Sequence, residues 1–207
     1  MGNNYFKNII YNTYRFPKEE ERVFMFIDMV DSTPTADKIG HLKYSRYIQD
    51  CFLDFSSILI GFDGEIYQFV GDEVVITWKT SKGFNYQKCM ELYFKYIDYL
   101  KRKEKFYLKK HNARPMFRCA IHYGTVSTAL VGDYKREMAY HGDVLNLCSR
   151  LQSACKENNT DMLISDSFYK KIDNCKEYDV NLVLLDDLKG IKKSISAYKV
   201  RLKTEST

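Results

Sequence analysis

The chain has 207 residues, 45% of them hydrophobic, which is enough to bury a substantial core in one α/β domain with short extensions. Its formal net charge of +5, from 32 basic and 27 acidic residues spread along the chain, is too small to indicate a nucleic-acid-binding protein. No segment resembles a signal peptide or approaches the roughly 20 apolar residues that span a bilayer, and the six cysteines form no Cys-X-X-Cys pair. We therefore expect a cytoplasmic protein with reduced thiols and no membrane segment.

The N-terminal part of the chain predicts an arm, a strand and a helix. Residues 1–21 combine aromatic and apolar side chains with a final acidic run, and we interpret them as an arm that precedes the domain. The apolar run from Arg22 to Val30, which contains VFMFIDMV, predicts a buried strand with Asp28 near its end. A helix is expected from about Thr33 to about Ile60, because capping residues and a proline occupy its start.

A β-hairpin is predicted from Gly64 to Lys79. Two segments rich in β-branched and aromatic residues, IYQFV and VVITW, lie on either side of Gly71-Asp72, so Asp72 should be at the tip. A second long helix is then expected from about Tyr86 to Lys110, before Pro115.

The C-terminal half predicts shorter elements around one further helix. FRCAIHY and VSTALV are expected to be strands on either side of a turn at Gly124, and a helix should follow from about Gly142 to Asn158. A short strand (162–164), a short helix (167–172) and two strands (182–185 and 197–202) complete the chain. This order predicts an α+β fold in which helices pack on a mainly antiparallel sheet, as one domain over residues 22–203 with a tail at 204–207.

Two aspartates are predicted to lie on rigid backbone, Asp28 at a strand end and Asp72 at a hairpin tip. Two carboxylates together with substrate phosphates suit Mg²⁺, although a single aspartate at a strand end is more often a turn or cap residue. Between Asp28 and the next helix, residues 29–33 would offer successive backbone N–H groups to a polyphosphate, with Ser32 and Thr33 at the helix start.

A second polar pair, Asn146 and Arg150, lies on the predicted helix that follows Gly142. The two residues are four positions apart and so project from one side of the helix. Arginine is the side chain expected where phosphate charge must be neutralised. On an isolated helix, solvent exposure alone would explain such a pair, so its weight depends on the other segments.

Four segments occur in order along the chain: FIDMVDST, GEIYQFVGDE, AIHYGTVSTALVG and HGDVLNLCSR. Together they resemble the catalytic domain of class III nucleotidyl cyclases, over about Val23 to Leu202. The resemblance implies a ferredoxin-like domain that dimerises head to tail and forms each active site from both subunits. It also implies closure of a nucleoside triphosphate to a 3′,5′-cyclic nucleotide and pyrophosphate, with two Mg²⁺ or Mn²⁺ ions per site.

The resemblance also assigns roles to individual residues. Asp28 and Asp72 match the two metal-binding aspartates of the family, and Asn146 and Arg150 match the pair that positions the ribose and stabilises the transition state. Lys189, in the segment DLKG, resembles the lysine that binds the terminal phosphate, although a simple turn lysine is nearly as good an interpretation.

Two positions associated with purine selection depart from the family's usual pairs. Adenylate-specific members typically have Lys and Asp, and guanylate-specific members Glu and Cys, where this chain has Gln68 and Ala139. Gln68 both donates and accepts hydrogen bonds, whereas Ala139 offers only bulk and its backbone. Asp31 stands where many relatives have Gly; it either repels phosphate or caps the helix, and we favour the cap.

A cyclase domain with these departures, and with no sensor or membrane domain in the chain, resembles the pyrimidine cyclases of bacterial anti-phage (Pycsar-type) systems. Those enzymes make cyclic UMP or cyclic CMP. We predict UTP, then CTP, as substrate, with Tyr67 or Tyr140 filling space beside the smaller base. The alternatives are an adenylate cyclase with an unusual base pocket and a non-catalytic cyclase-like module that binds nucleotide or a protein. An RNA-binding domain fits poorly, because the GDE tip does not match strands that expose aromatic residues.

Overall fold

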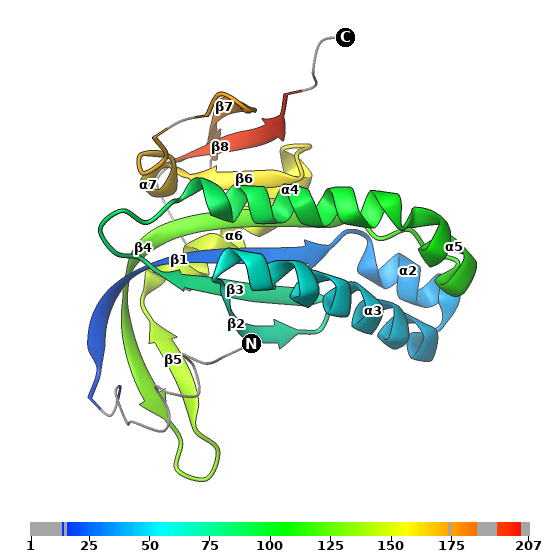
Figure 1. The fold of residues 1–207 in the computed structure, drawn as a ribbon, viewed down its shortest axis with the longest axis horizontal. Helices are drawn as coiled ribbons and strands as arrows, with labels where there is room; N and C mark the ends of the chain where they lie inside the picture. The colour runs from blue at the N-terminus through cyan, green and yellow to red at the C-terminus, as the bar shows by residue number, and fades with distance from the viewer. Residues whose placement is uncertain (1–13, 15, 174, 186–193, 204–207) are drawn as a thin grey trace.

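The computed structural model describes residues 14, 16–173, 175–185 and 194–203. In these residues one twisted sheet has helices on both faces, and its strand order is β2-β3-β1-β4-β6-β8-β7, with β5 paired to the outer part of β4 (Figure 1). The β4–β6 pair is parallel and the other six strand pairs are antiparallel, so the predicted α+β fold with a mainly antiparallel sheet is confirmed. The strands are β1 (Lys18–Met29), β2 (Glu65–Val70), β3 (Glu73–Lys79), β4 (Phe117–Val131), β5 (Glu137–His141), β6 (Met162–Ser165), β7 (Tyr178–Leu185) and β8 (Ile195–Leu202). The helices are α2 (Ser32–Ile39), α3 (His41–Leu59), η1 (Ile60–Phe62), α4 (Gln87–Arg102), α5 (Glu104–His111), α6 (Asp143–Glu157) and α7 (Asp166–Tyr169).

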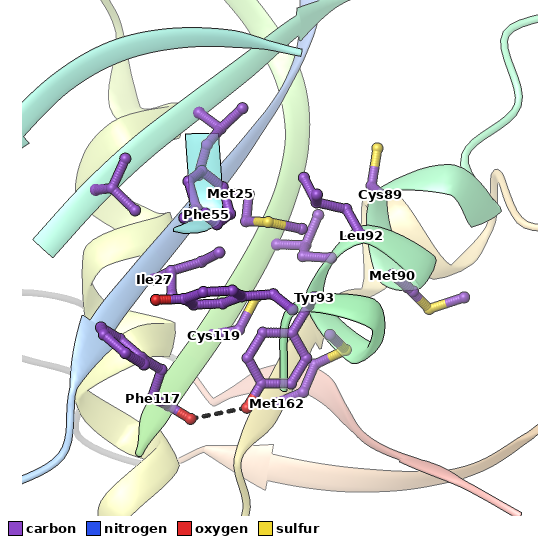
Figure 2. Packing of buried hydrophobic residues seen from close by; sticks show 14 of the residues in the cluster. Met25, Ile27, Phe55, Cys89, Met90, Leu92, Tyr93, Phe117, Cys119 and Met162 are labelled. Atoms are coloured by element: carbon purple, nitrogen blue, oxygen red, sulfur yellow. Dashed lines mark hydrogen bonds between the residues drawn. The ribbon is translucent and has the colours of Figure 1, made fainter. Parts of the chain in front are cut away.

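The sheet separates two cores, and β1 contributes side chains to both, because successive side chains of a strand point to opposite faces of the sheet. Its odd-numbered residues, such as Met25 and Ile27, pack beneath α3 and α4 in the larger core. There Phe55 and Tyr93 approach the sheet, and the Tyr93 hydroxyl donates a 2.8 Å hydrogen bond to the Phe117 carbonyl (Figure 2). The even-numbered residues of β1 belong to the second core, which α6 covers.

The first strand begins at Lys18, inside the segment predicted as an arm. The reason is Glu20, which is buried but accepts hydrogen bonds from Arg22 Nε (2.8 Å), Lys79 Nζ (2.6 Å) and the Tyr14 hydroxyl (2.6 Å). Burial opposes ionisation, but these donors together lower the pKa of Glu20 to about 2. The acidic run is therefore part of the sheet at Glu20, where the three donors compensate the charge of the buried carboxylate.

Both predicted long helices are broken in the structure. The expected helix at 33–60 is divided into α2 and α3 at Gly40, whose φ of 86° lies in the region that favours glycine. The expected helix at 86–110 becomes α4 and α5, which are separated at Lys103. Lys103 Nζ lies 2.7 Å from an Asp54 carboxylate oxygen, so the break is fixed by an ion pair with α3. The 86–110 sequence gives no local signal for this second break.

The predicted turn at Gly124 is wrong. β4 runs without interruption through this residue and pairs with β1 from Lys18 to Met29. A β-carbon at position 124 would lie 2.8 Å from Val144 Cγ2 of α6, so glycine is required here for close helix packing rather than for a turn. The true hairpin joins β4 to β5, a strand that the sequence analysis missed.

The C-terminal elements agree with the predictions in type but not always in length. α6, β6 and β8 lie close to the expected positions, whereas α7 begins at Asp166 and is shorter than the predicted helix. β7 begins at Tyr178, four residues earlier than expected, where the buried tyrosine ring stacks on Phe94 of α4 at 5.4 Å between centroids. The tail at 204–207 lies outside the described residues.

Candidate active site

Three carboxylates meet where β1 ends and the β2–β3 hairpin turns. Asp28 is the penultimate residue of β1, and its cross-strand partner is Glu73, the first residue of β3. Asp28 has the same parity as the β1 residues of the second core, so both side chains face α6. Asp72 precedes Glu73 in the hairpin turn and is close enough to raise the pKa of Asp28. The structure therefore brings Asp28 and Asp72 together, as the sequence predicts.

Neighbouring elements hold the two aspartates in place. Gln152 Nε2 of α6 donates a hydrogen bond to Asp28 Oδ2 at 3.0 Å, and the Tyr44 hydroxyl of α3 donates to Asp72 Oδ2 at 3.2 Å. Burial, followed by the charge of Asp72, raises the pKa of Asp28 to about 6, although the bond from Gln152 acts in the opposite direction. Burial and Asp72 likewise raise the pKa of Tyr44. The aspartates are thus partly shielded from water and lie close enough to repel each other.

Glu73 is a site residue that the sequence analysis did not single out. Burial, followed by the charges of Asp28 and Asp72, raises its pKa from the ordinary value of 4.5 to about 7. The signal was its position directly after Asp72: a two-residue turn places Glu73 at the start of the returning strand. Only the pairing of β3 with β1 reveals that Glu73 lies opposite Asp28.

The raised pKa values predict how pH changes the stability of the metal-free protein. Both acids bind their protons more tightly in the folded than in the unfolded chain, so stability falls as the pH rises from about 4 to about 7. Glu73→Gln, which cannot ionise, should reduce this fall in Tm by about 5 °C relative to wild type. Thermal denaturation in chelator-containing buffer measures the effect, with the exposed Glu157→Gln as control. Parallel pH profiles for wild type and Glu73→Gln would contradict the assignment.

The donor set fits a hard divalent cation. Within the described part of the chain, no group of three or more His, Cys, Asp or Glu side chains is placed to hold a metal ion. Asp28 and Asp72 are close enough for the charge of Asp72 to raise the pKa of Asp28, and a bound cation would relieve this repulsion. Mg²⁺ typically binds through one or two carboxylates and completes its shell with water and substrate phosphates. Mn²⁺ accepts the same oxygen ligands.

A cationic side chain lies opposite these acids. Arg118 of β4 is the cross-strand neighbour of Asp28 on the other side of β1, so the two share one sheet face. Its Nε is buried and has no hydrogen-bond acceptor among the described residues, which is costly unless a ligand satisfies it. The sequence analysis missed Arg118, although its place in the alternating strand FRCAIHY was the available signal.

The loop after Asp28 differs from its predicted form in two respects. The Val30 N–H donates to the Met116 carbonyl at 2.8 Å, so the loop does not offer an unbroken row of N–H groups. Asp31 occupies the N-cap position of α2 without a side-chain capping bond, which corrects the predicted cap. Its φ of 52° lies in the left-handed region, which glycine adopts most readily. Ser32, half-buried, and Thr33, exposed, begin the helix as expected.

Asn146 and Arg150 lie on the opposite flank of α6 from Asp28. Asn146 is exposed and Arg150 half-buried, whereas Gln152, which contacts Asp28, is two residues further along. At about 100° per residue, Arg150 and Gln152 are about 200° apart around the helix axis, which is about 160° in the other direction. One chain therefore does not bring the pair Asn146 and Arg150 to its own aspartates.

The two positions at which the sequence departs from the purine pairs, Gln68 and Ala139, flank one aromatic pair. Gln68 is exposed on β2 and lies opposite Val75, which belongs to the core beneath α6, and the register of β2 shifts at Tyr67. Ala139 pairs with Ala129 on the β4–β5 hairpin. The rings of Tyr67 and Tyr140, the neighbours of Gln68 and Ala139, have centroids 4.9 Å apart.

Tyr140, one of the two rings predicted to fill space beside the base, is buried. Its ring is buried between Phe24, at 5.3 Å, and the guanidinium of Arg22, at 4.7 Å from the ring centroid. It therefore supports the neighbouring positions from inside the core, which leaves the half-buried Tyr67 as the other candidate.

Lys189 lies outside the described residues. Among the helices of the described residues, none is both long and apolar enough to cross a membrane.

Comparison with known proteins identifies the family. The family described as the adenylate and guanylate cyclase catalytic domain matches residues 16–201. Adenylate cyclase 2 of Rhizobium meliloti (strain 1021) is 30% identical over 172 residues, which are 83% of this chain and 47% of that protein. The chain thus spans about half the length of this curated relative.

Solved structures share the fold at lower identity. The adenylyl cyclase CyaB from P. aeruginosa has a TM-score of 0.78 and 17% identity, covering 93% of this chain and 99% of that one. The guanylate cyclase domain of RhGC from Catenaria anguillulae, in complex with GTP, has a TM-score of 0.73 and 18% identity, covering 90% and 100%. Together with the match over residues 16–201, this fold shows that the chain belongs to the adenylate and guanylate cyclase catalytic domain family, whose members are nucleotidyl cyclases.

Proposed function

We propose that this chain converts a nucleoside triphosphate to a 3′,5′-cyclic nucleotide and pyrophosphate, as a homodimer in which each active site uses both subunits. The observation that carries the proposal is the proximity of Asp72 to Asp28, which shares its sheet face with Arg118. Two oxygen-donor acids near a guanidinium whose buried Nε has no acceptor among the described residues suit a metal-bound polyphosphate. Nothing in this arrangement requires a nucleophile from the protein, because the ribose 3′ oxygen of the substrate attacks its own α-phosphorus.

The chemistry can be divided among the residues of the chain. Asp28 and Asp72 would hold two Mg²⁺ or Mn²⁺ ions, which when bound supply charge neutralisation for the triphosphate and activation of the 3′ hydroxyl. Arg118 would donate N–H groups to phosphate oxygens from the floor of the site. Arg150 would meet the charge that grows on the α-phosphate, and Asn146 would hold the ribose in line for attack.

The position of Arg150 supports the shared site. Arg150 and Asn146 lie on the flank of α6 that points away from the aspartates of the same chain, as described above. A second copy in a two-fold arrangement supplies the missing flank to each site, because such an interface repeats every contact twice.

We further propose that the base is a pyrimidine, UTP in preference to CTP, and that the product is a second messenger of bacterial anti-phage defence. Gln68 is exposed on the sheet face of Asp28, where its amide would meet the adjacent carbonyl and N–H of uracil. Ala139 contributes no polar side-chain atom to a purine edge. The alternative is an adenylate cyclase with a non-standard pocket, which the likeness to the Rhizobium meliloti adenylate cyclase favours.

Base preference is tested by kcat/KM for ATP, GTP, UTP and CTP with Mg²⁺ or Mn²⁺, with products identified by mass. We expect UTP to be preferred, and we expect Gln68→Ala to reduce the preference for UTP over ATP by roughly 10-fold or more, with a smaller loss of kcat. Gln49→Ala, an exposed glutamine on α3, is the matched control and should leave the ratio unchanged. A clear preference for ATP would overturn the pyrimidine proposal and leave the cyclase proposal intact. Absence of any cyclic product would favour a non-catalytic module.

A further inference from the structure

We propose that Gln152 is a positioning residue for Asp28 of its own chain, so that α6 serves two active sites, one along each flank. One flank aligns a metal-binding carboxylate within the subunit, and the other presents Asn146 and Arg150 to the second subunit. The part that concerns the second subunit rests on the proposed function. The role of Gln152 toward Asp28 does not.

The contact itself suits a positioning role. Gln152 Nε2 and Asp28 Oδ2 are 3.0 Å apart and join α6 to β1 across 124 positions of sequence. Both residues are half-buried, so the bond is partly protected from competing water. A neutral amide donor fixes one carboxylate oxygen without cancelling the negative charge, whereas a lysine or arginine at this point would compete with a cation for Asp28.

The helix that carries Gln152 is firmly seated on the sheet. The Cys148 sulfur lies 3.4 Å from the Phe24 carbonyl and 3.5 Å from the Ala120 carbonyl, so it contacts both β1 and β4 and its one S–H has an acceptor on either strand. About two turns further along α6, the Cys155 thiol donates to the Cys119 carbonyl of β4 at 3.4 Å. These buried contacts fix the rotation of α6, and this rotation determines which flank faces Asp28.

Substitution of Gln152 tests the first part of the proposal without relying on catalysis. Gln152→Met keeps the length of the side chain and removes its hydrogen-bond donor. Mn²⁺ is titrated into the purified protein, and the rise in thermal stability gives the dissociation constant. We expect the constant for Gln152→Met to be about 10-fold higher than for wild type, which is the usual effect of removing a partner of a metal ligand.

The matched control is Ser153→Ala, which removes a hydroxyl one residue away that bonds within the helix to the Ser149 carbonyl. It should leave Mn²⁺ binding unchanged. A merely structural role for Gln152 would lower the Tm of the metal-free protein and leave the Mn²⁺ dissociation constant as in wild type. That result would overturn the proposal, and so would a wild type that binds no Mn²⁺.

Mixed dimers test which site each flank serves. In a dimer of an Asp72→Ala chain and an Arg150→Ala chain, the intact site takes its aspartates from the second chain. Adding Gln152→Met to that second chain should raise the Mn²⁺ concentration for half-maximal activity by about 10-fold. The same change in the Asp72→Ala chain should leave this concentration unchanged, and the reverse pattern would overturn the assignment. If mixed dimers are inactive while Gln152→Met still binds Mn²⁺ weakly, the shared site fails and the role of Gln152 stands.

Discussion

Asp72→Ala is expected to reduce turnover by about 10³-fold or more without unfolding the domain, and Asp28→Ala should do the same. Each variant removes one of the two carboxylates that would bind the cations, and neither residue belongs to a hydrophobic core. Removing Asp28 also removes a partly buried acid whose pKa is raised, so the metal-free variant should be at least as stable as wild type. Product formation followed by mass spectrometry, together with thermal denaturation, separates the two effects.

Asp37→Ala provides the matched control, because Asp37 is an exposed aspartate on α2 close to the site in sequence. It should retain wild-type turnover. Normal activity in both Asp28→Ala and Asp72→Ala would refute the assignment of the metal ligands. Loss of activity accompanied by unfolding would instead show that the aspartates stabilise the fold.

Mixing two inactive variants is expected to restore activity. Asp72→Ala lacks a metal ligand and Arg150→Ala lacks the arginine of the other flank, so each homodimer has two defective sites. In an equal mixture half of the dimers contain one chain of each kind, and each of these has one intact site, which predicts about one quarter of wild-type activity. The physical reason is the separation of Arg150 from Asp28 around α6, which prevents one chain from completing its own site.

Subunit exchange must be measured in the same mixture, for example with differently tagged chains. Mixing Asp72→Ala with Asp28→Ala is the control and should stay inactive, because both defects affect the same half of a site. If tagged chains exchange and the mixture of Asp72→Ala with Arg150→Ala stays inactive, the shared site is excluded.

Local sequence patterns predicted much of the fold because several elements carry their own signals. The β2–β3 hairpin follows from two strand-forming segments around Gly71-Asp72, and α6 follows from its apolar spacing. Two of the errors occurred where a distant residue decides the local structure. The ion pair from Lys103 to Asp54 breaks the second long helix, and compensation of Glu20 by Lys79 draws the acidic run into β1. Neither partner is near in sequence.

The candidate site was predicted to a similar extent. Asp28 and Asp72 were recognisable because each lies at the end of an element with a clear signal. Glu73, Arg118 and Gln152 were not recognised, because their proximity to Asp28 depends on strand register and on the rotation of a helix. These are properties of the assembled sheet, which a single stretch of sequence does not encode.

Gly124 shows how a residue without a side chain contributes to such a site. A β-carbon there would lie 2.8 Å from Val144 Cγ2, so either this side chain or α6 would have to shift. The same helix carries Gln152 toward Asp28 and, in the proposed dimer, Arg150 toward the second subunit, so a change of its height above the sheet would displace both. Gly124 has no part in the proposed chemistry. The distance between α6 and β4 nevertheless depends on its having no side chain.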